Sequence, residues 1–410
     1  MIAAAEKRGW GSRLRVVVHD YSGHPFQVEL SRGLAHRSTE DQIFHLYCAD
    51  HVGGKGNLGR GCTDPPNLEI RALTTSRKVH RYRPLSRLCH ELAYSFTAAT
   101  ALRTIRPDVV IHSNVPLLAH WLLMRLTSFP AIFWHQDVYS AAIRSALSKR
   151  LPFLGEKFAR VADRMERDVA IRSSIIVAIS DAFCPVYRRW GLKMENIFQM
   201  ANWAPIDELP VLPRHNLWSA EVDLDASFVA MYSGTLGLKH HPSLLSTLAE
   251  RLSARSNQLV VVISEGLGRE FLEEEITKRK LRNLRLLDFQ GYDQLPLALG
   301  SADVLLAILD PEASKYSVPS KVLTYMCAGK PIVALVPPDN QAALAIQTAN
   351  AGFVVNDTLQ FVEAVQRLRD DESLRVQQGR NARRYAEQTF DIARTVSRWQ
   401  DLVVLAGSCG

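Results

Sequence analysis

Residues 302–336 constrain the fold of this chain most, because they contain two apolar runs of strand length with a helix pattern between them. The runs are Ala302 to Leu309 and Pro331 to Val336, and continuous apolar runs of this length are typical of buried parallel strands. Ser317 is predicted to cap the intervening helix, and Gly329 is predicted to end it. The segment therefore indicates a strand–helix–strand unit of an α/β protein.

The polar residues of this unit are concentrated at the start of its helix. Pro319 fits the first helical turn, and Ser320 and Lys321 follow it together with backbone N–H groups that have no partner inside the helix. In a parallel sheet such a helix start lies above the carboxyl end of the preceding strand, where α/β proteins bind phosphate. We therefore expect Ser320 and Lys321 to bind a phosphate group.

The same alternation of apolar runs and helix patterns extends through both halves of the chain. Strands are predicted at 14–19, 43–48, 109–112, 131–135, 174–179, 228–232, 259–263, 284–287, 302–309 and 331–336. Helices are predicted at 25–36, 85–105, 117–127, 154–172, 242–253, 269–280, 317–326 and 392–405.

This pattern predicts two domains. A chain of 410 residues is long enough for two domains of roughly 150–200 residues each. The alternation fails near residues 202–219, which contain three prolines. We predict an α/β fold of two Rossmann-like, doubly wound domains with an interdomain cleft. Their bounds are 1–204 and 225–390, with a linker at 205–224 and a helix at 391–410 that returns to the first domain.

The charge of the chain is uneven. Its net charge is +7, and residues 71–106 contain eight Lys or Arg side chains but only one acid, Glu91. Leu85, Leu88 and Phe96 add apolar contacts to this segment. Such a segment can bind an anionic membrane surface, although a solvated face beside a core helix is the alternative. No nucleic-acid-binding motif accompanies the charge, so we expect no nucleic-acid partner.

The six cysteines show neither a CxxC pair nor the spacing of zinc ligands. This distribution argues against both a disulfide framework and a zinc site, and it fits a reducing compartment. The starting segment, MIAAAEKRGWGSRLR, lacks the apolar centre of about 7–15 residues that a secretory signal has. We therefore expect a cytoplasmic protein, with peripheral attachment to the inner face of the plasma membrane through residues 71–106.

Two further loops of the second half follow predicted strands. The turn Ser233-Gly234-Thr235 is followed by Lys239, and a lysine beside exposed backbone amides is suited to a diphosphate. After the next strand, the turn Glu265-Gly266-Leu267 allows close approach of a base or a ribose. Either turn alone fits an ordinary connection between a strand and a helix, but three such loops in successive units indicate one nucleotide site.

At these residues the chain resembles a known family. YSGTLGLKHHPSLL, the EGLG turn and SVPSKVLTYMCAGKPIVAL are similar to the nucleotide-binding domain of retaining GT-B glycosyltransferases of glycosyltransferase family four. Among these, the likeness is to bacterial enzymes that build capsule, O-antigen or exopolysaccharide. HDYSGHPFQVELSRGLA and WHQDVY resemble two motifs of the family's first domain, and the likeness covers about residues 14–400.

The resemblance implies a reaction and its substrates. The donor would be a nucleoside-diphosphate sugar, the acceptor a lipid-linked or free saccharide, and the transfer would proceed with retention. No cofactor is implied. No metal is expected either, because no Asp-x-Asp signature stands at a strand end. Negative charge develops on the departing diphosphate, so Lys239 and Lys321 are predicted to stabilise the leaving group.

The resemblance also assigns roles in the first domain and to the ribose. His135 follows an apolar strand, is expected to face the cleft and is assigned as a catalytic residue that contacts the donor sugar, with Asp137 orienting it. Ser22, Gly23 and His24 would form the opposing lip. Thr324 occupies the position at which the family commonly has a ribose-binding glutamate, and a hydroxyl offers no bidentate carboxylate clamp.

Two alternatives remain open. Nucleotide-sugar epimerases share the two-domain architecture, but they need a general acid and base near the sugar, and no paired carboxylates occur in matching positions. A non-catalytic subunit that binds a nucleotide sugar is favoured by the threonine at position 324.

Overall fold

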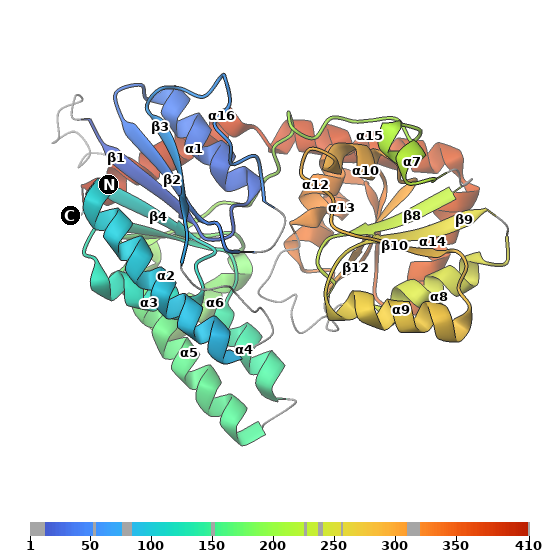
Figure 1. Cartoon of the computed structure of the whole chain (residues 1–410), viewed down its shortest axis with the longest axis horizontal. Coiled ribbons are helices and arrows are strands. Elements are labelled where there is room, and N and C mark those ends of the chain that lie inside the picture. Colours follow the sequence, from blue (N-terminus) through green and yellow to red (C-terminus); the bar gives the residue numbers. More distant parts are fainter. Residues whose placement is uncertain are drawn as a thin grey trace. The chain divides into compact units, whose positions relative to one another are not determined.

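The computed structural model of the chain describes residues 13–51, 55–75, 84–148, 152–224, 228–236, 241–255, 257–309 and 320–408. Two compact units are present (Figure 1): unit 1 comprises Met1–Asn202 and Ile392–Gly410, and unit 2 comprises Trp203–Asp391. Each unit contains a parallel sheet with helices, which confirms the predicted α/β class. Residues 205–224, predicted as a linker, are part of unit 2.

Unit 1 is built on seven parallel strands in the order β3-β2-β1-β4-β5-β6-β7. The order reverses between β1 (Arg15–Asp20) and β4 (Val109–Ser113), so the chain leaves these neighbouring strands toward opposite faces of the sheet. Their carboxyl ends are the place at which such sheets bind ligands. The other strands are β2 (Gln42–Cys48), β3 (Leu68–Leu73), β5 (Ala131–His135), β6 (Ile175–Ala178) and β7 (Ile197–Gln199).

Two neighbouring side chains of β5 show how helices cover both faces of this sheet. Trp134 contacts Phe26 of α1 (Pro25–Arg37) and Trp399 of α16 (Ile392–Gly407), with ring centroids 5.6 and 4.6 Å away. Phe133 points to the other face and contacts His120 of α3 (Leu117–Leu126) at 5.0 Å. The remaining α-helices described in unit 1 are α2 (Pro84–Ile105), α4 (Tyr139–Ser148), α5 (Pro152–Arg172) and α6 (Cys184–Trp190).

Some elements of unit 1 were not predicted. The strand β3 was missed because it lies at the sheet edge and carries Glu69 and Arg71, whose ion pair interrupts the apolar run. The strand β7 has only three residues, and α4 was also missed. The other predicted strands and helices of this unit are confirmed within a few residues at each end.

Unit 2 is built on six parallel strands in the order β10-β9-β8-β11-β12-β13. Its order reverses between β8 (Phe228–Ser233) and β11 (Val304–Ile308). The other strands are β9 (Gln258–Ile263), β10 (Leu284–Leu287), β12 (Ile332–Leu335) and β13 (Gly352–Val355). The described α-helices are α7 (Leu217–Glu221), α8 (Ser243–Leu252), α9 (Leu267–Arg279), α10 (Leu295–Gly300), α12 (Lys321–Cys327), α13 (Gln341–Ala349), α14 (Thr358–Asp370) and α15 (Glu372–Thr389).

The predicted helix after β11 is described only from residue 320 onward. Helix α12 starts at Lys321, and Ser320 occupies its N-cap position without a side-chain capping bond. The predicted cap, Ser317, and Pro319 lie outside the described residues. The predicted end is confirmed, since Gly329 follows the helix with φ of +65°, a left-handed conformation that favours glycine.

Helix α16 belongs to unit 1 although it comes after unit 2 in the sequence. Trp399 is fully buried against the sheet, and Val396 lies against α1. The close approach of the two helices needs a residue without a side chain at position 33, because a Cβ on Gly33 would overlap Val396.

We expect Gly33→Ala to lower the free energy of unfolding of unit 1 by about 1–3 kcal/mol through overpacking against Val396. Val396→Ala vacates the same space, so the double variant should lose less stability than the sum of the two single variants. Urea unfolding of the full-length variants measures this coupling. Strict additivity would contradict the contact.

Candidate functional site

A buried tyrosine of α12 forms hydrogen bonds to the carboxyl end of β8. The hydroxyl of Tyr325 accepts a hydrogen bond from the backbone N–H of Ser233 at 2.9 Å and donates one to the Ser233 carbonyl at 3.0 Å. The next amide, that of Gly234, donates to the Ile263 carbonyl of β9 at 3.0 Å. These bonds fix the turn after β8 relative to two neighbouring elements. Sequence reasoning missed this role of Tyr325, although its position in α12 was predicted.

Lys321 lies directly against this turn. Its ammonium nitrogen is 3.7 Å from the ring centroid of the buried Tyr232, a cation–π contact. A Cβ on Gly234 would come within 3.0 Å of the same nitrogen, and the φ of +130° at this position also favours glycine. The sequence SG in this turn therefore provides the space that the lysine occupies.

The electrostatic state of Lys321 is unusual. Desolvation lowers its pKa to about 7, since burial disfavours the charged form. No carboxylate of the described residues forms an ion pair with it, although aspartates and glutamates are common elsewhere in unit 2. An ammonium held in this way can be stabilised by an anion that enters from solvent.

The loop after β9 packs against the loop after β8. The amide of Gly268 donates to the Leu236 carbonyl at 2.9 Å, and a Cβ at position 268 would overlap this oxygen. Gly266, at the N-cap of α9, has φ of +94°. The structure thus brings together the three predicted loops, which carry Ser233 to Thr235, Glu265 to Leu267, and Ser320 with Lys321.

The structure describes the surroundings of most, but not all, of the other residues predicted for the donor site. Thr235 and Ser320 are exposed at the edge of these loops and are accessible to a ligand. Thr324 is half-buried one turn after Lys321 in α12. Lys239 lies outside the described residues, so its predicted contact with a diphosphate stays a prediction.

His135 stands at the carboxyl end of β5, as predicted, but its ring is fully buried instead of facing a cleft. Its Nδ1 lies 2.8 Å from the Tyr187 hydroxyl, and its Nε2 lies 3.3 Å from Glu166. These two partners orient the ring, and the predicted orienting role of Asp137 stays a prediction.

Glu166 is a buried structural anchor. Its carboxylate accepts hydrogen bonds from the amides of Tyr139 and Ser140 at 2.6 and 3.0 Å, and from the Ser140 hydroxyl at 2.6 Å. A carboxylate at the first turn of α4 fixes the start of that helix. Sequence spacing does not reveal this arrangement.

The predicted lip, Ser22 to His24, is shaped by the buried carboxylate of Asp20. Asp20 accepts hydrogen bonds from the amides of Ser22 and His24 at 3.2 and 2.5 Å and from the Asn114 side chain at 3.2 Å. Burial raises the pKa of Asp20. The turn after β1 is therefore held rigidly at the point where the strand order of unit 1 reverses.

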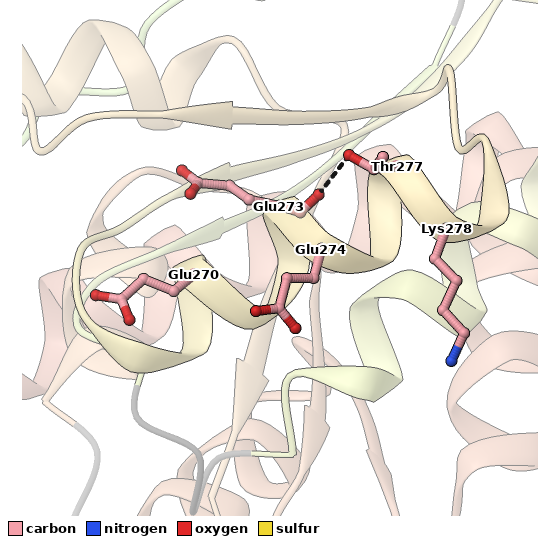
Figure 2. A pocket seen from close by; sticks show the side chains of 5 residues that line it. All are labelled: Glu270, Glu273, Glu274, Thr277 and Lys278. Atoms are coloured by element: carbon pink, nitrogen blue, oxygen red, sulfur yellow. Dashed lines mark hydrogen bonds between the residues drawn. The ribbon is translucent and has the colours of Figure 1, made fainter.

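A surface hollow of about 500 Å³ lies on α9 and does not belong to this site. Figure 2 shows its lining side chains, Glu270, Glu273, Glu274, Thr277 and Lys278, all from one helix. The side chains point outward, and the dashed hydrogen bond joins Thr277 to the backbone carbonyl of Glu273 within the helix. Such a hollow has none of the converging polar groups that a ligand site needs.

Among the described residues, one group of His, Cys, Asp or Glu side chains is close enough to share a metal ion: Cys48, Asp50 and His90 in unit 1. None of the described helices combines the length and apolar character of a membrane span.

Comparisons with known proteins agree with this geometry. The profile of the family described as "Glycosyl transferases group 1" matches residues 218–385. WcaI of Escherichia coli (strain K12), assigned as a colanic acid biosynthesis glycosyl transferase, is 26% identical over 323 residues, covering 75% of this chain and 77% of that protein. Residues 218–385 match a glycosyltransferase family, and the chain has the GT-B fold.

Solved structures of this fold superimpose over nearly the whole glycosyltransferase. The crystal structure of Anabaena Alr3699/HepE in complex with UDP-glucose has a TM-score of 0.67 at 15% identity and covers 95% of this chain and 100% of that one. Sucrose-phosphate synthase from Thermosynechococcus elongatus has a TM-score of 0.70 at 12% identity, with coverages of 95% and 98%.

The lowered pKa of Lys321 predicts a pH-dependent stability. Between pH of about 7 and about 10 the unfolded lysine holds a proton that the folded one has released, so the stability of unit 2 should rise with pH in this window. Lys321→Met should weaken this rise, whereas Lys278→Met, at an exposed position of α9, should leave it unchanged. Urea midpoints measured across the window test this, and parallel profiles for the parent and Lys321→Met would contradict it.

Proposed function

We propose that this glycosyltransferase moves a sugar from a nucleoside-diphosphate sugar to a saccharide acceptor, with retention and without a metal ion. The observation that carries the proposal is the half-buried Lys321 ammonium, which has no carboxylate partner among the described residues and lies against the turn after β8. A diphosphate is the anion that fits a lysine beside backbone amides and hydroxyls at the carboxyl end of a parallel strand.

Lys321 would act on the leaving group. Breaking the bond between sugar and diphosphate leaves negative charge on the diphosphate, and a cation fixed beforehand stabilises that charge without reorganisation. The hydrogen bonds of Tyr325 to Ser233 hold the turn in place for this contact. Lys239 would add a second positive charge and Thr235 and Ser320 would add hydroxyl donors. These donors supply the stabilisation that a divalent cation supplies in other enzymes.

A uridine nucleotide is the best-supported donor to test first. HepE, which shares the fold, was crystallised with UDP-glucose and with UDP. The Glu265–Leu267 turn would contact the base or ribose, since Leu267 is exposed and Gly266 allows close backbone approach. Thr324 would give the ribose a single hydrogen bond where a glutamate gives two.

Two similar proteins support a role of this enzyme in polysaccharide assembly. WcaI is assigned to colanic acid biosynthesis, and a similar structure, WaaG, is described as a glycosyltransferase involved in lipopolysaccharide biosynthesis, with a TM-score of 0.64 at 16% identity. A lipid-linked acceptor would require the enzyme to work at the cytoplasmic face of a membrane. We infer a saccharide acceptor carried on a lipid.

We propose helix α2 as the surface for such attachment. Leu85, Leu88, Leu92 and Phe96 recur at intervals of three or four residues and are exposed, Leu85 at 77% and Phe96 at 59%. They therefore form one apolar stripe on the helix. Basic side chains of the 71–106 segment would attract anionic headgroups, each contributing about 1 kcal/mol at the surface.

We expect Lys321→Met to lower the turnover number by about 10²-fold, because one preset donor to the leaving group is lost. Lys330→Met is the matched control, since it removes a half-buried lysine beyond the other end of the same helix. Transfer from labelled UDP-sugars to lipid-linked acceptors measures the effect. Isomerised donor without transfer would indicate an epimerase, binding without either would indicate a non-catalytic subunit, and equal rates in both variants would contradict the role of Lys321.

We expect the protein to sediment with anionic liposomes at low salt and to be released at high salt, since the attraction to headgroups is screened. The variant Leu85→Ser/Phe96→Ser should bind more weakly. Leu359→Ser removes an equally exposed apolar side chain from α14 in unit 2 and should bind normally. Absence of sedimentation at low salt would remove the membrane proposal and leave the transfer reaction untouched.

A further inference from the structure

Three side chains with different metal-binding chemistry meet at the carboxyl edge of the unit 1 sheet. Cys48 is the last residue of β2, Asp50 lies in the loop after it, and His90 comes from α2. One donor atom of each lies within 4.8 Å of the other two. The Cys48 sulfur is 3.8 Å from Nε2 of His90. A thiol, a carboxylate and an imidazole from two distant segments thus converge on one point.

Thr75 holds two members of this cluster in a defined orientation. Its amide and its hydroxyl both donate to Oδ2 of Asp50, at 2.7 and 3.0 Å. With its proton directed to Asp50, the hydroxyl oxygen accepts from Nδ1 of His90 at 3.0 Å. In this arrangement Nδ1 of His90 faces Thr75, and Nε2 faces the Cys48 sulfur. Metal-binding histidines are oriented in the same manner, by a hydrogen bond from the other ring nitrogen.

The cluster lies mostly in the protein interior. Cys48 and His90 are buried and Asp50 is half-buried. A divalent ion supplies the positive charge that a buried thiolate and carboxylate require, and it displaces the thiol proton to solvent.

We propose that unit 1 binds a zinc ion through Cys48 Sγ, the Asp50 carboxylate and His90 Nε2, with water completing a tetrahedral set. Zinc bonds to sulfur and to imidazole nitrogen set these two atoms about 3.6 Å apart in a tetrahedron, close to the present separation. The Asp50 donor atom lies within 4.8 Å of both. Mixed sulfur, nitrogen and oxygen ligands suit zinc better than magnesium or calcium, which prefer oxygen alone.

The ion would tie together loops that shape the predicted acceptor lip. Tyr21, directly before Ser22, has its ring centroid 5.3 Å from that of His51 and 6.4 Å from that of His90. A zinc ion would therefore link the loops after β1, β2 and β3 to α2. This inference does not rest on the proposed transfer reaction, because metal binding is measured without substrate.

Cobalt(II) titration of the metal-free, full-length protein without a histidine tag tests the site. Cobalt takes zinc ligand sets and reports a thiolate ligand by a near-ultraviolet charge-transfer band and tetrahedral geometry by intense visible bands. We expect one equivalent to bind with both signals and zinc to displace it. Zinc should also raise the thermal midpoint of the protein by mass action.

Matched variants identify the ligands. Cys48→Ser should lose the charge-transfer band, while Cys89→Ser, which alters an exposed cysteine next to His90, should keep it. Thr75→Val retains all three ligands and should weaken zinc binding by about 10–100-fold through loss of the orienting bonds. Circular dichroism confirms that each variant is folded. No charge-transfer band in the parent protein, or an equal band in Cys48→Ser, would overturn the proposal.

Discussion

The ammonium of Lys321 lies over the Tyr232 ring without a carboxylate partner among the described residues, and neighbouring residues of unit 2 shape the space that it occupies. Gly234 leaves the space beside it, and Tyr325 fixes the turn from below with two hydrogen bonds to Ser233. A lysine in this setting has a lowered pKa, so the charged form is stabilised only when an anion is bound. In the proposed function, the same contact would couple the fold of unit 2 to its ligand.

In unit 1, buried carboxylates hold the backbone in place after β1 and at the start of α4. Asp20 accepts hydrogen bonds from the backbone amides of the turn after β1. Glu166 accepts hydrogen bonds from the amides at the start of α4, beside His135. Each carboxylate accepts several hydrogen bonds, which offset the cost of burial. Rigid loops on both sheets follow from this, and rigid loops position reacting groups better than mobile ones.

Much of the fold could be predicted from sequence because buried parallel strands are continuous apolar runs, as in Val109–Ser113 and Val304–Ile308. The edge strand β3 could not, since its charged residues break that signal. In the candidate site, glycine turns and Lys321 were visible as local motifs. The hydrogen bonds between Tyr325 and Ser233 and the burial of His135 depend on contacts between distant segments, which local motifs do not show. Cys48 and His90 are 42 residues apart, so a search for closely spaced metal ligands in the sequence does not find them.

The central claim is that a desolvated lysine receives a nucleoside diphosphate. NMR titration of the Lys321 ammonium, assigned with Lys321→Met, measures it most directly. The account predicts a pKa of about 7 in the free protein. It also predicts a rise of about 1–3 units when UDP is bound, since a nearby opposite charge favours the charged form. An ordinary lysine pKa in the free protein, or the same value with and without saturating UDP, would contradict the account.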